Sequence, residues 1–568
     1  MIHTKFSPSR IPPLDLLIIP LIVLLCFYFV GFQVENASPD LVSLLESHQN
    51  ENQVNFEVAL EKETKILHMR RAPANPSYPL AASGYGMTVG YMNLPEAAIQ
   101  PTNETYQQLD FNGTQLTSEK SVSTFSVDVD SGGYSNVRRL LDQGILPQRN
   151  QVRTEEFINY FSYDYPSPQS VEKPFTVTTN LTQSPWNKNS HLLHIGIKGF
   201  EQQVSELPNS NLVFLVDVSG SMQDENKLEL AKRSLRLLVQ NLRKDDRISL
   251  VTYARNTQVV LSSIDGRNKA LIMAAIDSLG AGGSTAGESG LKLAYMQAQQ
   301  GFIKDGNNRI IMMTDGDFNV GLSGVDEMVR LVERKRDAGV FLSTVGFGSG
   351  NYREDMMEQM ADHGNGIYFY IDSYREALRV FERNLRSNLF AIAKDVKIQV
   401  EFNPTQVSEY RLVGYENRLL KREDFNNDKV DAGDIGQGHS VTALYEITFS
   451  ENKGKIEPNR YNISSVDPAK TSPEIAFLKL RYKPLGSDNS RLLNKVVTRK
   501  VLPASEISLN FKTAIVAASF AELLRDSQYL SRKFDYSKLE SMINKLGDNQ
   551  SAEMLELYQL VAIAQSLE

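Results

Sequence analysis

The fold is decided by one stretch of sequence, Leu212-Val213-Phe214-Leu215-Val216-Asp217-Val218-Ser219-Gly220-Ser221. Its apolar half is typical of a buried strand, and a carboxylate and two hydroxyls follow directly. Hard divalent cations such as Mg²⁺ prefer oxygen ligands, so the pattern is compatible with a metal site at the edge of a sheet. The same residue types also accept hydrogen bonds from the free N–H groups at a helix start, so this stretch alone could be a helix cap.

Two later segments also place oxygen-bearing side chains in a loop or at the end of an apolar run. Gly282-Gly283-Ser284-Thr285-Ala286-Gly287 supplies a hydroxyl in a glycine-rich loop, and Ile310-Ile311-Met312-Met313-Thr314-Asp315-Gly316 is a second apolar run that ends in Asp. With these segments the chain resembles the von Willebrand factor type A (VWA) domain and its metal-ion-dependent adhesion site (MIDAS). The resemblance implies a bound Mg²⁺, or Mn²⁺ or Ca²⁺, and five metal ligands: Asp217, Ser219, Ser221, Thr285 and Asp315.

Three further stretches resemble signatures of one bacterial group of extracytoplasmic VWA proteins, in which conserved segments flank the VWA domain on both sides. They are Ser123-Thr124-Phe125-Ser126-Val127-Asp128-Val129-Asp130, Thr314-Asp315-Gly316-Asp317-Phe318-Asn319-Val320-Gly321 and Tyr410-Arg411-Leu412-Val413-Gly414-Tyr415-Glu416-Asn417-Arg418. This resemblance runs from about residue 104 to the C-terminus. It implies an architecture more than a biochemical role.

Composition excludes some classes of function. The chain has 568 residues, of which 41% are hydrophobic and 23% charged, which is ordinary for a soluble protein of more than one domain. A net charge of −8 argues against a nucleic-acid binder, which needs excess Lys and Arg. The one cysteine, Cys26, rules out an intramolecular disulfide but not an extracytoplasmic location.

The N-terminus predicts a membrane signal over residues 1–32. Residues 16–32 are apolar, with Lys5 and Arg10 before them and Glu35 and Asp40 after them, which places the N-terminus in the cytoplasm and the bulk of the chain outside. At 1.5 Å per residue the run spans about 26 Å, slightly less than a hydrocarbon core. We favour an uncleaved anchor over a cleaved signal peptide, which would give a secreted protein. Lipidation of Cys26 is disfavoured by the preceding Leu24-Leu25.

Residues 33–120 are interpreted as a tether, because a stretch rich in Pro, Ala, Gly and Tyr within it has no sustained periodicity. Residues 121–208 read as a globular segment that carries short helices and then two strands over 175–181 and 192–197. Asp128-Val129-Asp130 superficially resembles an aspartate-nucleophile phosphatase motif. Those enzymes require Thr or Val at the position of Gly132, so we expect local turn capping instead.

Residues 209–386 alternate between strand and helix patterns. The predicted strands are 211–217, 247–254, 257–264, 309–315, 340–346 and 367–372, and the predicted helices are 226–242, 267–279, 287–300, 324–338, 353–362 and 374–385. Such alternation predicts an α/β fold, a doubly wound and mostly parallel sheet with helices on both faces. If the strands that end at Asp217 and Asp315 are neighbours, both residues face one crevice at the carboxyl edge.

Residues 387–505 change to strand patterns over 396–402, 440–449, 475–482 and 494–502, with no helical pattern between them. We predict an antiparallel β-sandwich that recruits the strands of the 121–208 segment, so that the VWA domain is an insertion between its two halves. Residues 506–568 return to helical spacing and predict a small helical module at the end of the chain.

The expected function is metal-dependent binding of a protein or envelope ligand that offers a carboxylate. Glu288 and Asp317 lie beside the motifs and are candidates for the rim, although solvated surface charge is the favoured interpretation for each alone. One alternative is a structural scaffold of a membrane complex with metal-independent contacts. A metal-assisted hydrolase is the other. The chain lacks GxSxG, GxxxxGK[ST] and HExxH, and its seven His are scattered: strand alternation puts His191 and His194 on opposite faces, and we expect His363 in a loop. We therefore expect no enzyme.

Overall fold

The computed structural model describes residues 103–316, 324–350, 352–457, 472–487, 489–547 and 551–568. The predicted membrane signal and residues 33–102 of the predicted tether lie outside this part. Within it, no helix combines the length and the apolar character that a bilayer crossing requires. The tether ends earlier than predicted: the backbone N–H groups of Asn103 and Thr105 donate to Gly350 and Tyr352, and strand β1 (Gln115–Leu116) pairs with β12 (Val407–Val413).

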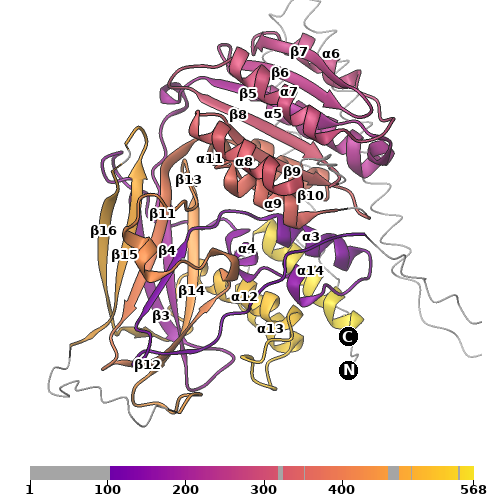
Figure 1. The fold of residues 1–568 in the computed structure, drawn as a ribbon. Coiled ribbons are helices and arrows are strands. Elements are labelled where there is room, and N and C mark those ends of the chain that lie inside the picture. The colour runs from indigo at the N-terminus through magenta and orange to yellow at the C-terminus, as the bar shows by residue number, and fades with distance from the viewer. Residues whose placement is uncertain (1–102, 317–323, 351, 458–471, 488, 548–550) are drawn as a thin grey trace, which may run out of the picture. The chain divides into compact units, whose positions relative to one another are not determined.

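The inserted α/β unit is built on a six-stranded sheet in the order β10-β9-β8-β5-β6-β7 (Figure 1). All neighbours are parallel except β6 and β7, which are antiparallel. The strands are β5 (Ser210–Asp217), β6 (Arg247–Tyr253), β7 (Thr257–Asp265), β8 (Asn307–Thr314), β9 (Phe341–Phe347) and β10 (Tyr368–Ile371). The six predicted strands agree with these bounds to within two residues.

Alternation along β5 explains why both faces of this sheet are covered. Val213 and Leu215 point to a core formed with helices α7 (Gly287–Gln300), α8 (Gly324–Asp337) and α9 (Glu354–His363). Leu212, Phe214 and Val216 point to the opposite core, formed mainly with α5 (Leu230–Gln240), α6 (Lys269–Asp277), α10 (Tyr374–Leu378) and α11 (Leu385–Leu389). The last turn of α10 continues as the π-helix η5 (Arg379–Arg383). A strand buried on both faces reads as a continuous apolar run, which is the pattern of residues 212–216.

The described chain outside the α/β unit forms a set of helices, described below, and two sheets that share one core. One has the order β1-β12-β14-β4-β3-β17, and the other has the order β13-β11-β15-β16 with β2 paired to β11. Segments from both sides of the α/β unit supply the strands: β2 (Val122–Ser126), β3 (Phe175–Gln183), β4 (His191–Gly199), β11 (Ala391–Phe402), β13 (Ile435–Gly436), β14 (Ser440–Phe449), β15 (Glu474–Pro484), β16 (Arg491–Thr498) and β17 (Val501–Leu502). The α/β unit is therefore inserted into a sandwich.

The predicted strand 494–502 differs from the structure. The chain leaves β16 after Thr498, and Arg499 and Lys500 carry it to β17, which pairs in parallel with β3 of the opposite sheet. The prediction merged two short strands because only two charged residues separate them. This crossing joins the two sheets near the end of the sandwich.

The C-terminal helices α12 (Leu509–Leu524), α13 (Tyr536–Asn544) and α14 (Ala552–Leu567) do not form a module of their own. They share a core with α3 (Gly132–Asp142) and α4 (Thr154–Asn159) from the segment before the α/β unit. Side chains of Ser508, Asp535 and Ser551 accept hydrogen bonds from N–H groups in the first turns of the three helices and fix where they begin. Helical periodicity predicted these elements, but it does not say which partner covers an apolar face.

Short helical turns complete the path: η1 (Arg149–Gln151), η2 (Val204–Glu206), η3 (Gly220–Gln223), η4 (Glu225–Glu229), η6 (Glu416–Arg418) and η7 (Arg422–Asn426). Two of them, η3 and η4, follow Asp217 and lead into α5. They position the polar residues at the carboxyl edge of the α/β sheet.

Candidate metal site

Two adjacent strands bring Asp217 and Asp315 to the same edge of the sheet. β5 ends at Asp217, β8 ends at Thr314, and the two strands pair in parallel with Val213 opposite Ile310. The predicted adjacency is confirmed. Both carboxyl groups are buried, with 0% exposure. Carboxyl ends of neighbouring strands in such sheets form the crevice where ligands bind.

Backbone hydrogen bonds join the three loops at this edge. The N–H of Val218 donates to Tyr253 O at 3.0 Å, that of Gly220 to Gly283 O at 2.9 Å, and that of Gly282 to Val218 O at 2.8 Å. Gly283 has φ +90°, and a Cβ there would lie 3.2 Å from the Arg255 Cβ. A side chain at this position would strain a left-handed backbone, so glycine allows the loop before α7 to approach the DxSxS segment.

Side chains of the DxSxS segment converge. Asp217 Oδ1 accepts from the Ser219 N–H at 2.8 Å, and Asp217 Oδ2 accepts from the Thr314 hydroxyl at 3.0 Å. The Ser219 and Ser221 hydroxyl oxygens lie 2.9 Å apart. Asp217 is thus held by the end of the neighbouring strand as well as by its own loop, and its local bond to Ser219 is the turn that a capping interpretation would also produce.

Thr285 lies in the loop before α7 and is half-buried. In the part of the chain that the structure describes, no side-chain hydrogen bond joins it to the other four predicted ligands. Its loop reaches the site through Gly282 and Gly283. Of the two expected rim residues, Glu288 lies in the first turn of α7 and pairs with Lys292 at 2.6 Å, and Asp317 lies outside the described residues.

Sequence reasoning missed Lys227. Its Nζ donates to Asp315 Oδ2 at 3.0 Å and to Ser221 O at 2.9 Å, and its side chain is only 7% exposed. Gly348 makes room for it, because a Cβ there would lie 2.4 Å from Lys227 Cε. A signal was present: Lys227 directly precedes the apolar stripe of residues 228–242, and a buried lysine needs an anionic partner.

The donor set fits a hard divalent cation. Burial raises the pKa of Asp217 to about 6; hydrogen bonds from Ser219 and Thr314 oppose this rise, and the charge of Asp315 adds to it. Two buried carboxylates with one ammonium leave negative charge that a cation would neutralise, and every side-chain donor is oxygen. Among the described residues, no group of three or more His, Cys, Asp or Glu could hold a metal, so a cation here would depend on hydroxyl ligands.

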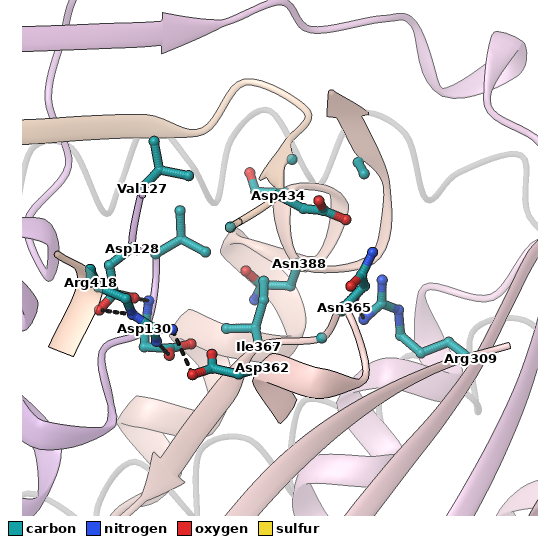
Figure 2. A pocket seen from close by; sticks show the side chains of 16 residues that line it. Val127, Asp128, Asp130, Arg309, Asp362, Asn365, Ile367, Asn388, Arg418 and Asp434 are labelled. Carbon is teal, nitrogen blue, oxygen red and sulfur yellow. Dashed lines mark hydrogen bonds and ion pairs between the residues drawn. The ribbon is translucent and has the colours of Figure 1, made fainter. Parts of the chain in front are cut away.

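A second polar cluster joins the flanking segments to the α/β unit (Figure 2). Arg418 Nε lies 3.1 Å from Asp128 Oδ2, its Nη2 lies 2.8 Å from Asp130 Oδ2, and its Nη1 lies 2.6 Å from Asp362 Oδ2 on α9. The expected turn at Asp128 exists, since Asp128 Oδ1 accepts from the Asp130 N–H at 2.9 Å. Turn capping was nevertheless an incomplete prediction, because Arg418 holds both carboxylates.

The cavity beside this cluster measures only about 40 Å³, enough for a few water molecules and too small for a substrate. Arg153 continues the network behind it, with ion pairs to Glu354 and Glu358 on α9. These contacts give the cluster a structural role as the joint between α9 and the sandwich.

The histidines in the part of the chain that the structure describes do not assemble a reactive centre. His194 is fully buried, stacks on Phe511 at 4.8 Å between ring centroids, and its pKa falls to about 3 because burial disfavours its charged form. His191 lies against Phe449, on the opposite face as predicted. The loop prediction for His363 was wrong: it is the last residue of α9, where Nδ1 lies 2.9 Å from Glu333 Oε1, because helical geometry extends up to Gly364.

Known proteins match this chain along most of its length. The model of the "von Willebrand factor" family matches residues 100–194, that of the "von Willebrand factor type A domain" matches 211–384, and that of "Uncharacterized protein YfbK, C-terminal" matches 387–567. "Uncharacterized protein YfbK" of Escherichia coli (strain K12) is 45% identical over 441 residues, which cover 76% of this chain and 76% of that protein.

Solved structures resemble parts of the chain. The "von Willebrand factor type A from Catenulispora acidiphila" is 16% identical and covers 64% of this chain and 81% of its own, with a TM-score of 0.38. A proximal thread matrix protein from the mussel byssus, solved "with zinc occupied MIDAS motif", is 23% identical and covers 31% of this chain and 45% of its own, with a TM-score of 0.27.

Proposed function

Because the chain belongs to the bacterial family of VWA proteins that includes YfbK of Escherichia coli, we propose that it binds a protein or envelope ligand through a metal held by Asp217, Ser219, Ser221, Thr285 and Asp315. One observation carries the proposal. Two buried carboxylates stand at the ends of the adjacent strands β5 and β8, beside two hydroxyls 2.9 Å apart. A cation bound there would offer an electrophilic position to a carboxylate of the partner.

The residues of the chain have separate roles in this proposal. The Ser219 and Ser221 hydroxyls, and Thr285 from its loop, provide neutral oxygens that leave a cation electrophilic. Asp217 and Asp315 provide the charge that attracts it. The bond from Thr314 orients Asp217, and Lys227 balances Asp315. Mg²⁺ suits such a site because it keeps several water ligands beside the protein oxygens. Mn²⁺ and Ca²⁺ also bind oxygen ligands and are the other candidates.

The site would bind its ligand without converting it to a product. Its donor set includes no positioned general base, and the buried His194 is neutral at pH 7. We therefore propose that the protein is not an enzyme.

For the location of the protein we propose an anchor in residues 16–32 with the bulk of the chain outside the cytoplasm, on the strength of the apolar run and its flanking charges. Protease treatment of intact and of permeabilised spheroplasts tests this. Digestion of the C-terminal bulk in intact spheroplasts is expected, and protection until permeabilisation would contradict the proposal.

The binding proposal is tested with the full chain in nanodiscs as bait for solubilised envelope proteins, with Mg²⁺ or with EDTA. The variants are Asp217→Ala and Ser221→Ala. Ser289→Ala is the matched control, because Ser289 lies on α7 and the side-chain hydrogen bond that its hydroxyl makes among the described residues goes to Ala286 O. Partners lost with EDTA and in both site variants, but kept in the control, would support metal-bridged binding.

A structural scaffold is the second candidate. The observation in its favour is the buried joint of Arg153 and Arg418 with α9, which fixes the α/β unit to the sandwich. Partners retained in EDTA and in all three variants would favour this scaffold and overturn metal bridging.

A further inference from the structure

A cleft of about 460 Å³ lies between the end of β3 and the C-terminal helices α12 and α13. Its floor is apolar. The floor is formed by Ile507, Ile515, Val516, Met542 and Leu546, which belong to the helical core or pack against it. Two of these, Met542 and Leu546, remain half-buried, so the core leaves apolar surface open to this cleft.

The rim of the cleft is cationic. Lys512, Lys538 and Lys545 line it, and no Asp or Glu is among its lining residues. Over the described residues, no ion pair or side-chain hydrogen bond involves any of these three ammonium groups. An apolar floor with three lysines above it is complementary to a molecule with an apolar body and an anionic head.

The size of the cleft favours a small molecule over a protein partner. A stable protein interface uses about 20 to 30 residues on each side, whereas this cleft is lined by only 13. Its volume falls in the range of roughly 300 to 1,000 Å³ that is typical of small-molecule sites. A single flexible chain fits a narrow floor of aliphatic side chains, and each methylene buried there adds roughly fourfold to affinity.

We propose that this cleft binds a long-chain carboxylic acid, with the alkyl chain on the floor of Ile515, Val516 and Met542 and the carboxylate beside the lysines. Lysine provides a point charge on a long stem, so three of them can follow a head group that is not fixed by bidentate geometry. This binding would be independent of the metal site, because none of the lining residues belongs to the α/β unit.

The test uses the full chain in nanodiscs and a photoreactive diazirine analogue of dodecanoate, with the labelled residues mapped by mass spectrometry. Labels are expected on the residues that line the cleft. Unlabelled dodecanoate should compete at least tenfold better than dodecanol, which has the same chain and no charge. Equal competition by the alcohol, or labels only on residues that do not line the cleft, would overturn the proposal.

A charge-reversal variant makes the test specific. Lys512→Glu, Lys538→Glu and Lys545→Glu together should reduce labelling about tenfold or more at an unchanged melting temperature, since the lysine side chains reach the surface. The matched control combines Lys244→Glu, Lys304→Glu and Lys421→Glu, three exposed lysines that do not line the cleft. An equal loss of labelling in the control would show a general charge effect and would also overturn the proposal.

Discussion

Arg418 and Asp130 form an ion pair of 2.8 Å between segments that lie on opposite sides of the α/β unit in the sequence. Both belong to stretches that resemble family signatures, and neither contacts the candidate metal site. Arg418 also reaches Glu358 and Asp362 on α9. The two signatures therefore meet at one point, where they hold a helix of the inserted unit.

Replacement of Arg418 by Ala is expected to destabilise the protein by about 3 to 5 kcal/mol, because it leaves several buried carboxylates without their cation. Urea unfolding followed by circular dichroism measures this. Arg267→Ala is the control: its side chain is 61% exposed and lies 3.6 Å from Asp245, so the change should stay within about 0.5 kcal/mol. A loss below about 1 kcal/mol for Arg418→Ala would show that the cluster does not carry the joint.

The raised pKa of Glu155 makes the free energy of unfolding depend on pH. Burial, and then the charges of Glu416 and Asp128, raise its pKa from 4.5 to about 7, and burial also raises the pKa of Glu358 to about 8. A carboxyl group with a raised folded pKa binds more protons in the folded state. The free energy of unfolding therefore falls as pH rises from about 4.5 through 7 to 8.

Glu155→Gln should reduce this slope and stabilise the protein at pH 8 by about 1 to 3 kcal/mol, since one pKa unit corresponds to about 1.4 kcal/mol. The amide oxygen of Gln can still accept the Tyr415 N–H, which Glu155 accepts at 2.9 Å. Chemical unfolding at pH 5, 6.5 and 8 provides the measurement. If the variant and the natural chain lose stability in parallel over this range, Glu155 does not hold the proton assigned to it.

Gly132 tests the packing of α3 against β10. A Cβ at this position would lie 2.2 Å from Tyr368 Cε1 on β10, and Tyr368 is fully buried. Gly132→Ala must displace the ring, so a loss of roughly 1 to 3 kcal/mol is expected in thermal or chemical unfolding. Gly280→Ala is the control, since a Cβ there meets nothing within 4 Å. Equal effects of the two variants would mean that the Tyr368 ring moves aside without a loss of unfolding free energy.

The α/β unit could be predicted because its signals are local. Apolar runs such as residues 212–216 and the helical stripe of 228–242 specify both element type and burial. The sandwich was predictable for the same reason: β14 was expected over 440–449 and spans those residues. Strands as short as β13 (Ile435–Gly436) leave no periodicity to read, so sequence alone did not reveal them.

Partners of charged residues could not be predicted, because they depend on contacts between distant segments. The sequence predicts turn capping at Asp128 and Asp130, but not that Arg418, 288 positions after Asp130, holds them. The prediction of a separate C-terminal helical module failed for the same reason. The apolar faces of these helices do not indicate that α3 and α4 pack against them. The ligand assignment of Asp217 and Asp315 stays a prediction, although the adjacency of their strands is confirmed.

Lys227 leads to the prediction that tests the metal site most directly. Its ammonium group bonds to Asp315 and competes electrostatically with a cation for that carboxylate. Lys227→Met keeps the length of the stem and removes the charge, so the affinity for Mg²⁺ should rise about tenfold, equivalent to about 1.4 kcal/mol. Without metal the variant should be less stable, because Asp315 is buried beside Asp217 and has lost this cation.

Isothermal titration with Mg²⁺, and melting curves with Mg²⁺ or EDTA, measure both effects. Lys232→Met is the matched control: this lysine is also nearly buried, lies one turn further along, and bonds to Glu229 and Leu279 O instead of the site. It should leave the Mg²⁺ affinity unchanged. A fall in affinity for Lys227→Met alone would assign Lys227 the opposite role, that of orienting Asp315 for the cation.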